Sequence, residues 1–208
     1  MRAWSLLFSV CLTALFVNGC APSFSELQSA KLVEMNRVEV AANYSMVSFL
    51  HEGENEKMQD HFGLQFAYGV LDNVNFRFRY ERIDVDPLDT GVNAWGFGPK
   101  ICLKKDVAAI YLPVGFATGE NIETSESWQF HPTLLTTAPV NEYMELNTSF
   151  KYLLTFDEDS NDYFAFNLGL GLSNDLARYA IRPEVGILID PGSDGIFWHF
   201  SVGLSLFL

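Results

Sequence analysis

Residues 167–186 read NLGLGLSNDLARYAIRPEVG, and both halves of this stretch alternate large apolar residues with small or polar ones. Leu168, Leu170 and Leu172 keep a period of two before the polar break, and Ile181 and Val185 resume it afterwards. Strict alternation is typical of a β-strand, because successive side chains point to opposite faces. The stretch therefore predicts two strands joined by a turn.

A glycine-rich phosphate loop is the alternative interpretation of LGLGLSND. A dinucleotide fingerprint needs a third glycine and then a helix whose N-terminus receives the pyrophosphate. Asn174 stands where that third glycine belongs, and the residues after it alternate with period two, whereas a helix has a period of 3.6. The nucleotide-site interpretation is therefore rejected.

The same alternation recurs in segments along the chain from residue 38 to the end. Each of them is long enough to cross a bilayer as a tilted strand. Ten such segments are predicted, centred on residues 38–46, 62–70, 74–80, 95–103, 110–116, 128–134, 144–154, 164–172, 179–187 and 198–206.

The connections between these segments also alternate. Short turns are predicted at Asp72-Asn73, Lys105-Asp106, Asn141-Glu142 and Asn174-Asp175, and longer polar loops at 51–60, 86–91, 119–127, 157–162 and 190–195. Short turns at one end, long loops at the other and an even strand number are typical of outer-membrane barrels. We therefore predict an all-β fold, a ten-stranded antiparallel up-and-down transmembrane β-barrel over residues 38–208.

A soluble up-and-down barrel also alternates, but it places its large apolar side chains inside. The large residues on the apolar face of this chain are too many for so narrow a lumen, because about eight strands enclose only a filling of side chains or one small ligand. The apolar face is therefore expected to point outward and the small residues, such as Gly169 and Gly171, inward. On the outward face we expect Trp95, Trp128 and Trp198 to form an interfacial aromatic girdle.

The first twenty residues, MRAWSLLFSVCLTALFVNGC, begin with a positive charge and continue with an apolar run too short to span a bilayer. They predict a signal peptide over residues 1–19. The ending VNGC resembles the lipobox of bacterial lipoproteins, which implies acylation of Cys20; ordinary cleavage near the same point is the alternative. Residues 20–37 are expected to be a periplasmic tether, with the N-terminus on the short-turn, periplasmic side.

Several segments, among them GVNAWGFGPK at 91–100 and YAIRPEVGILIDPG at 179–192, resemble small outer-membrane β-barrel proteins of Gram-negative bacteria, most closely uncharacterised barrels from the Bacteroidota. The final strand, FWHFSVGLSLFL, resembles the C-terminal assembly signal of such barrels. The resemblance implies a location in the bacterial outer membrane, with membrane lipids and the barrel-assembly machinery as partners. It implies no activity, because one fold serves many functions.

The inward face is expected to carry a network of charges. Five are basic and four acidic, so they can nearly neutralise one another, as buried charges must. They are Glu39, Arg77, Arg79, Glu81, Lys100, Glu145, Lys151, Arg182 and Glu184. The favoured interpretation is a lumen closed by ion pairs in a protein with a structural or surface-interaction role. The alternative is a narrow channel for small ions or solutes, in which Arg77, Arg79 and Arg182 select anions.

The long loops are strongly acidic, with Lys57 as their one cation, and they account for most of the net charge of -13. Such a rim is usually a solvated surface, and divalent cations are candidate partners for it. An acidic chain of this kind is unsuited to nucleic acid. No cofactor or metal site is predicted.

An enzyme is not predicted, although a hydrolase at the rim is a less favoured alternative. Its candidate residues are Asp84, Asp86, His131, His199 and Ser201. A serine hydrolase needs a serine and a histidine within hydrogen-bond reach and a third group that orients the histidine. Each histidine is interpreted as a hydrogen-bonding residue of the lumen, and Cys102 as a small lumen filler.

Overall fold

The computed structural model describes residues 24–86, 90–119, 122–156, 162–191 and 194–208. Within these ranges the protein is built from antiparallel strands. They are β1 (Val38–His51), β2 (Glu54–Leu71), β3 (Val74–Val85), β4 (Thr90–Lys104), β5 (Ala108–Tyr111), β6 (Val114–Gly119), β7 (Gln129–Phe130), β8 (Thr133–Asn141), β9 (Met144–Thr155), β10 (Tyr163–Leu172), β11 (Tyr179–Ile189) and β12 (Ile196–Phe207). The predicted signal peptide and Cys20 lie outside the described residues.

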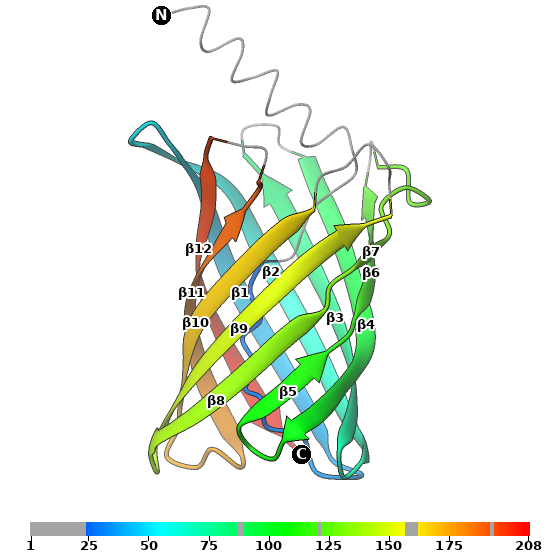
Figure 1. Ribbon diagram of the computed structural model, residues 1–208, viewed down its shortest axis with the longest axis vertical. Coiled ribbons are helices and arrows are strands. Elements are labelled where there is room, and N and C mark those ends of the chain that lie inside the picture. Colours follow the sequence, from blue (N-terminus) through cyan, green and yellow to red (C-terminus); the bar gives the residue numbers. More distant parts are fainter. Residues whose placement is uncertain (1–23, 87–89, 120–121, 157–161, 192–193) are drawn as a thin grey trace, which may run out of the picture.

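The strands close into a barrel, because β1 pairs with both β2 and β12 (Figure 1). The twelve elements make ten barrel strands. β5 and β6 both pair with β4 and are separated by Leu112 and Pro113, and β7 and β8 both pair with β9 and are separated by His131 and Pro132. Proline has no amide hydrogen for the ladder, so each of these strands is interrupted at its proline. The predicted ten-stranded antiparallel barrel is confirmed.

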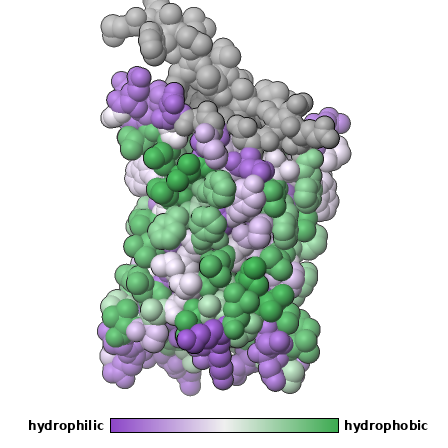
Figure 2. Space-filling view, in the orientation of Figure 1, coloured by the Kyte–Doolittle hydropathy of each residue, from purple (hydrophilic) through white to green (hydrophobic). Residues whose placement is uncertain are grey.

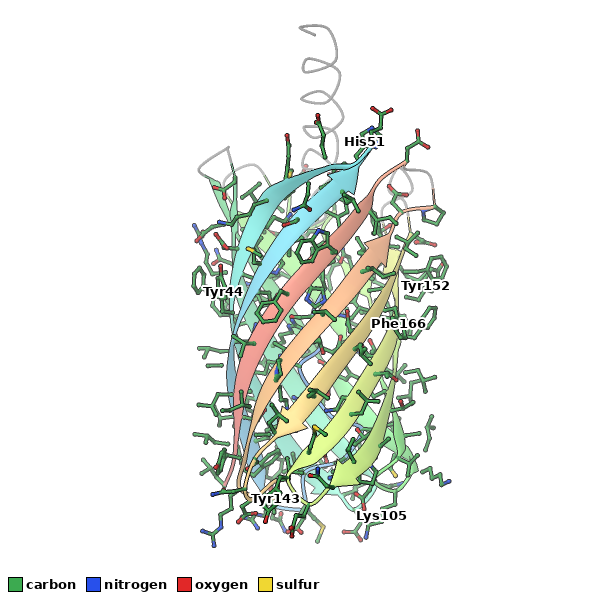
Figure 3. The ribbon with its side chains drawn as sticks, turned by 90° about the vertical axis from the view of Figure 1, so that its left-hand side faces the viewer. Tyr44, His51, Lys105, Tyr143, Tyr152 and Phe166 are labelled. Carbon is green, nitrogen blue, oxygen red and sulfur yellow. The ribbon has the colours of Figure 1, made fainter. Side chains whose placement is uncertain are left out.

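The predicted phase of the alternation is also confirmed. On β2, Leu64 and Phe66 are 57% and 44% exposed, whereas Gln65 and Ala67 between them are 5% and 0% exposed. Tyr44, Tyr152 and Phe166 project outward (Figure 3), and apolar residues cover the middle of the face shown in Figure 2, between polar ends. In the part of the chain that the structure describes, no helix has the length and apolar character needed to span a bilayer.

The connections differ in detail from the prediction. The two-residue turn at Asp72-Asn73 is confirmed, but the connection after β4 has three residues, 105–107, with Asp106 at φ 58°. The turn between β8 and β9 is shifted to 142–143, and 173–178 form a six-residue connection between β10 and β11.

The predicted long loop at 51–60 is instead a strand extension. Glu52 and Gly53, at φ 48° and 86°, form the two-residue turn between β1 and β2. Positive φ at both positions is the geometry that hairpins of this length require. The β1–β2 hairpin therefore protrudes at the long-loop end (Figure 1).

The expected periplasmic tether, residues 20–37, is the main difference between prediction and structure. Residues 20–23 lie outside the described residues, but Phe24–Ala30 are all buried and follow the inside of the barrel. We call residues 24–37 the lumen segment. It lies inside because its polar groups and small side chains match those of the inward wall. If the segment were a solvated tether outside the barrel, buried charges of the wall would have no partners.

At Gly69 on β2 the backbone of the lumen segment lies directly against the backbone of the wall. Asn36 donates a backbone hydrogen bond to the Gly69 carbonyl at 2.9 Å, and Gly69 donates one to the Arg37 carbonyl at 3.0 Å. A Cβ at Gly69 would lie 2.0 Å from the carbonyl oxygen of Glu34. The absence of a side chain at this inward position therefore makes room for the segment.

Gly69→Ala is expected to destabilise the barrel by about 1–3 kcal/mol, the usual cost of overpacking a filled interior. Urea unfolding in detergent, followed by tryptophan fluorescence, measures this change. Gly96→Ala is the matched control, because a Cβ there would meet only the Cβ of Arg79 at 4.0 Å. Equal stability of the two variants would contradict the close approach at Gly69.

Candidate functional site

The lumen contains all nine charged residues that were predicted to face inward, and each is buried. Three ion pairs form between strands of the wall or within one strand. Arg77 Nη1 lies 2.7 Å from Glu39 Oε2, and Arg182 Nη1 lies 2.9 Å from Glu145 Oε1. Arg79 Nη2 lies 2.5 Å from Glu81 Oε1, and His61 contacts the other oxygen of Glu81 at 3.3 Å.

The lumen segment supplies partners for the other three charges. Glu26 Oε1 lies 2.5 Å from Lys151 Nζ. The backbone amides of Glu26 and Leu27 donate to the two carboxylate oxygens of Glu184 at 2.7 and 2.9 Å. Lys100 Nζ donates to the carbonyls of Ser29 and Lys31 at 2.6 and 2.8 Å. The segment thus binds charges of both signs. It binds Lys151 through the Glu26 side chain, and Glu184 and Lys100 through its backbone.

Further contacts fix the segment along its length. Arg79 donates to the carbonyl and the hydroxyl of Ser25, and Lys31 Nζ lies 2.8 Å from Glu145 Oε2. Ala30 donates its amide to Thr137 Oγ1 at 2.7 Å. These bonds reach from the middle of the lumen to its short-turn half, so the segment is held by the wall throughout.

Glu26 balances the charge of the wall. With Glu26, the four acidic groups predicted for the wall become five, equal to its five basic ones; Lys31, whose side chain is 35% exposed, adds a cation next to Glu145. The Glu26 carboxylate lies directly against the Lys151 ammonium, at 2.5 Å, and so neutralises the excess positive charge of the wall.

Sequence reasoning missed Glu26 and Lys31 because the segment has no sustained alternation and was assigned to a tether. One signal in the sequence does point to it. The nine predicted lumen charges leave one basic group in excess, and a buried charge without a partner is costly. That imbalance calls for an acidic group from outside the predicted strands.

A small cavity lies beside the lumen segment, lined by Glu26, Arg79, Tyr111, His131 and Lys151 among others. Its volume, counted as the space open to the centre of a water molecule, is about 40 Å³. A water needs roughly 10–15 Å³ on this measure, so the cavity has room for about three waters. Apolar side chains such as Trp95 and Phe116 also line it, and it is too small for an organic solute.

The hydrolase candidates contain one arrangement with catalytic geometry. Ser201 Oγ lies 2.7 Å from His199 Nδ1, and His199 Nε2 lies 2.9 Å from Asn167 Oδ1, so a hydroxyl, an imidazole and an orienting amide are connected. These three side chains are 0–1% exposed. Asn167 also donates to the carbonyl of Phe24 at 3.1 Å, so the lumen segment covers the group. Substrate has no access to it in this structure.

The remaining hydrolase candidates are not brought together. Asp84 pairs with Arg82 at 2.9 Å, Asp86 with Lys57 at 3.2 Å, and His131 contacts Gln129 at 2.7 Å. Cys102, expected as a lumen filler, is partly exposed and carries a free thiol. Among the described residues, no group of three or more metal-ligating side chains is arranged to hold an ion.

The three predicted girdle tryptophans lie on the outside of the barrel. Trp95 contacts Tyr80 at a ring-centroid distance of 4.5 Å and Phe116 at 6.4 Å, and Phe116 contacts Trp128 at 4.9 Å. Trp198 Nε1 donates to Asn55 Oδ1 at 2.7 Å. Their proposed role as an interfacial girdle stays a prediction.

No protein-family model and no curated protein matches this chain. Solved structures that are similar in fold include three bacterial barrels. The COG4313 outer membrane channel from Pseudomonas putida F1 is 9% identical, with a TM-score of 0.53 over 88% of this chain and 100% of that one. The translocator domain of the autotransporter NalP from Neisseria meningitidis is 8% identical, with a TM-score of 0.49 over 99% and 96%. The attachment invasion locus protein Ail of Yersinia pestis is 11% identical, with a TM-score of 0.38 over 84% and 99%. At these identities the likeness concerns the fold alone: this chain has the fold of outer-membrane β-barrels.

A double-mutant cycle on Glu26 and Lys151 is expected to show strong coupling. Glu26→Gln alone or Lys151→Met alone should cost about 3–5 kcal/mol of unfolding free energy, because each removes one partner of a buried pair. The double variant should cost much less than the sum of the two.

The matched control is the exposed pair of Arg178 and Asp175, whose side chains are 82% and 43% exposed. An exposed pair is worth at most about 1 kcal/mol. Equal coupling in the two cycles, measured by urea unfolding, would contradict the buried pair in the lumen.

Proposed function

We propose that this protein resides in the bacterial outer membrane as a closed barrel with a structural or surface-interaction role. Its apolar band faces the lipid, its acidic long-loop end faces outward and its lumen is shut. In this account the protein works through its outer rim, and the lumen provides rigidity. Membrane lipids and the barrel-assembly machinery are the expected partners.

The observation that carries this proposal is the burial of the lumen segment. Seven consecutive residues, Phe24–Ala30, are between 1% and 7% exposed inside the barrel. The described cavity beside them accommodates only about three waters. A solute would have to displace the segment and break its bonds to Lys100, Lys151 and Glu184 before it could pass.

A narrow channel is the second candidate. The water-sized cavity beside the segment favours it, as does the similarity in fold to the COG4313 outer membrane channel. In that case the segment acts as a plug that moves aside. The two candidates differ in whether the filled lumen conducts ions.

The acidic rim is the proposed surface for partners. Within the described residues, Lys57 lies 2.5 Å from Asp60 and 3.2 Å from Asp86, which partly neutralises the rim at β2 and β3. Other acidic side chains, such as Glu54, Glu56 and Asp194, are exposed. Binding of divalent cations by this rim stays a prediction.

Wild-type protein in a planar lipid bilayer is expected to show no sustained ionic conductance. The double variant Ser25→Cys/Ser45→Cys, in a Cys102→Ser background, allows the segment to be locked, because the two hydroxyl oxygens are 3.3 Å apart. The reduced protein is the control for the oxidised one. Conductance that disappears on oxidation would support the plugged channel, and conductance that persists in the oxidised protein would contradict closure by the segment.

A further inference from the structure

The first described residue of the lumen segment, Phe24, lies at the long-loop end of the barrel. It packs in an apolar cluster with Val47, Leu153, Leu188 and Tyr163. Val47 is close to the end of β1, Leu188 is the next-to-last residue of β11, and Tyr163 is the first residue of β10. The start of β10 and the end of β11 carry long loops, and the β1–β2 hairpin protrudes at the same end of the barrel.

The other end of the segment lies at the short turns. Ala30 packs with Ala109 and Tyr111 of β5, which follows the short connection 105–107. Arg37 Nε donates to the carbonyl of Leu208 at 3.3 Å, and the C-terminus lies at the short-turn end in Figure 1. The chain thus descends the lumen from the long-loop end, reverses at Arg37 and returns upward as β1.

The reach of the chain before Phe24 is limited by geometry. Cys20 precedes Phe24 by four residues, so their Cα atoms are at most about 14 Å apart even in a fully extended chain. The level of Phe24 is set by Val47, nine residues along β1 from Val38 at the short-turn end. Nine residues of a strand tilted by about 40° rise roughly 23 Å along the barrel axis. Cys20 therefore cannot reach the short-turn end.

We infer that the chain threads its own barrel, so that the mature N-terminus leaves at the long-loop end. Cys20, the predicted acylation site, then lies on the same side of the membrane as the acidic loops. A lipid attached there would insert in the leaflet on that side. That this side is the cell surface rests on the proposed orientation of the barrel. The threading of the chain through the barrel does not depend on that orientation.

Thiol labelling from one side of the membrane tests this inference. In a Cys102→Ser background, Pro22→Cys reports the chain just before the lumen segment. Asp194→Cys reports the long-loop end and Asn174→Cys the short-turn end, and both of these residues are exposed. A membrane-impermeant maleimide is applied to intact cells, and to cells whose outer membrane has been permeabilised.

We expect Pro22→Cys and Asp194→Cys both to react in intact cells. Asn174→Cys should react only after the outer membrane has been permeabilised. If Pro22→Cys and Asp194→Cys both react only after permeabilisation, and Asn174→Cys reacts in intact cells, the threading holds and the proposed orientation is wrong. Reaction of Pro22→Cys together with Asn174→Cys, or reaction only after denaturation, would overturn the inference.

Discussion

The structure depends on one constraint: each charge buried in the barrel lumen needs a partner. Arg77, Arg79 and Arg182 find carboxylates on the wall, but Lys100 and Glu184 have their hydrogen-bond partners in the lumen segment. Truncating one partner of a buried ionic contact costs several kcal/mol, so the segment and the wall stabilise each other. The lumen segment is therefore part of the barrel core. It fills the lumen as inward-facing side chains fill the interior of a smaller barrel.

This dependence has a consequence for assembly. The segment connects directly to β1, and the barrel closes where Val38 and Leu208 exchange backbone hydrogen bonds at 3.1 and 2.8 Å. The segment can be in place before this seam forms, or it can enter the closed barrel from one end. Glu184 on β11 and Lys100 on β4 bind the segment from different parts of the wall, so the segment joins strands that are far apart in the chain. The charges that fill the lumen therefore hold early and late strands of the barrel together.

Sequence reasoning predicted the barrel well because each strand has one face in lipid and one in the lumen, so the period of two is visible along most of the chain. The same reasoning located Lys100, Lys151 and Glu184 inside. It misplaced the lumen segment, because a chain that is surrounded by wall on all sides has no alternating pattern. It also read the β1–β2 hairpin as a loop, since residues 54–57 are polar on both faces, and only the positive φ of Glu52 and Gly53 defines the turn. Contacts such as Ser201 with His199 and Asn167 depend on strand register, which a single sequence does not specify.

The most direct test of this account is amide hydrogen exchange of residues 24–33 in the detergent-solubilised or membrane-embedded protein. The amides of Glu26, Leu27 and Ala30 all have buried acceptors inside the barrel. We expect peptides from this segment to exchange as slowly as those from β1 and β12, because an opening that exposes them has to break several buried contacts together. Exchange as fast as that of an unstructured chain, with the strands still protected, would show that the segment is outside the lumen and would contradict the account.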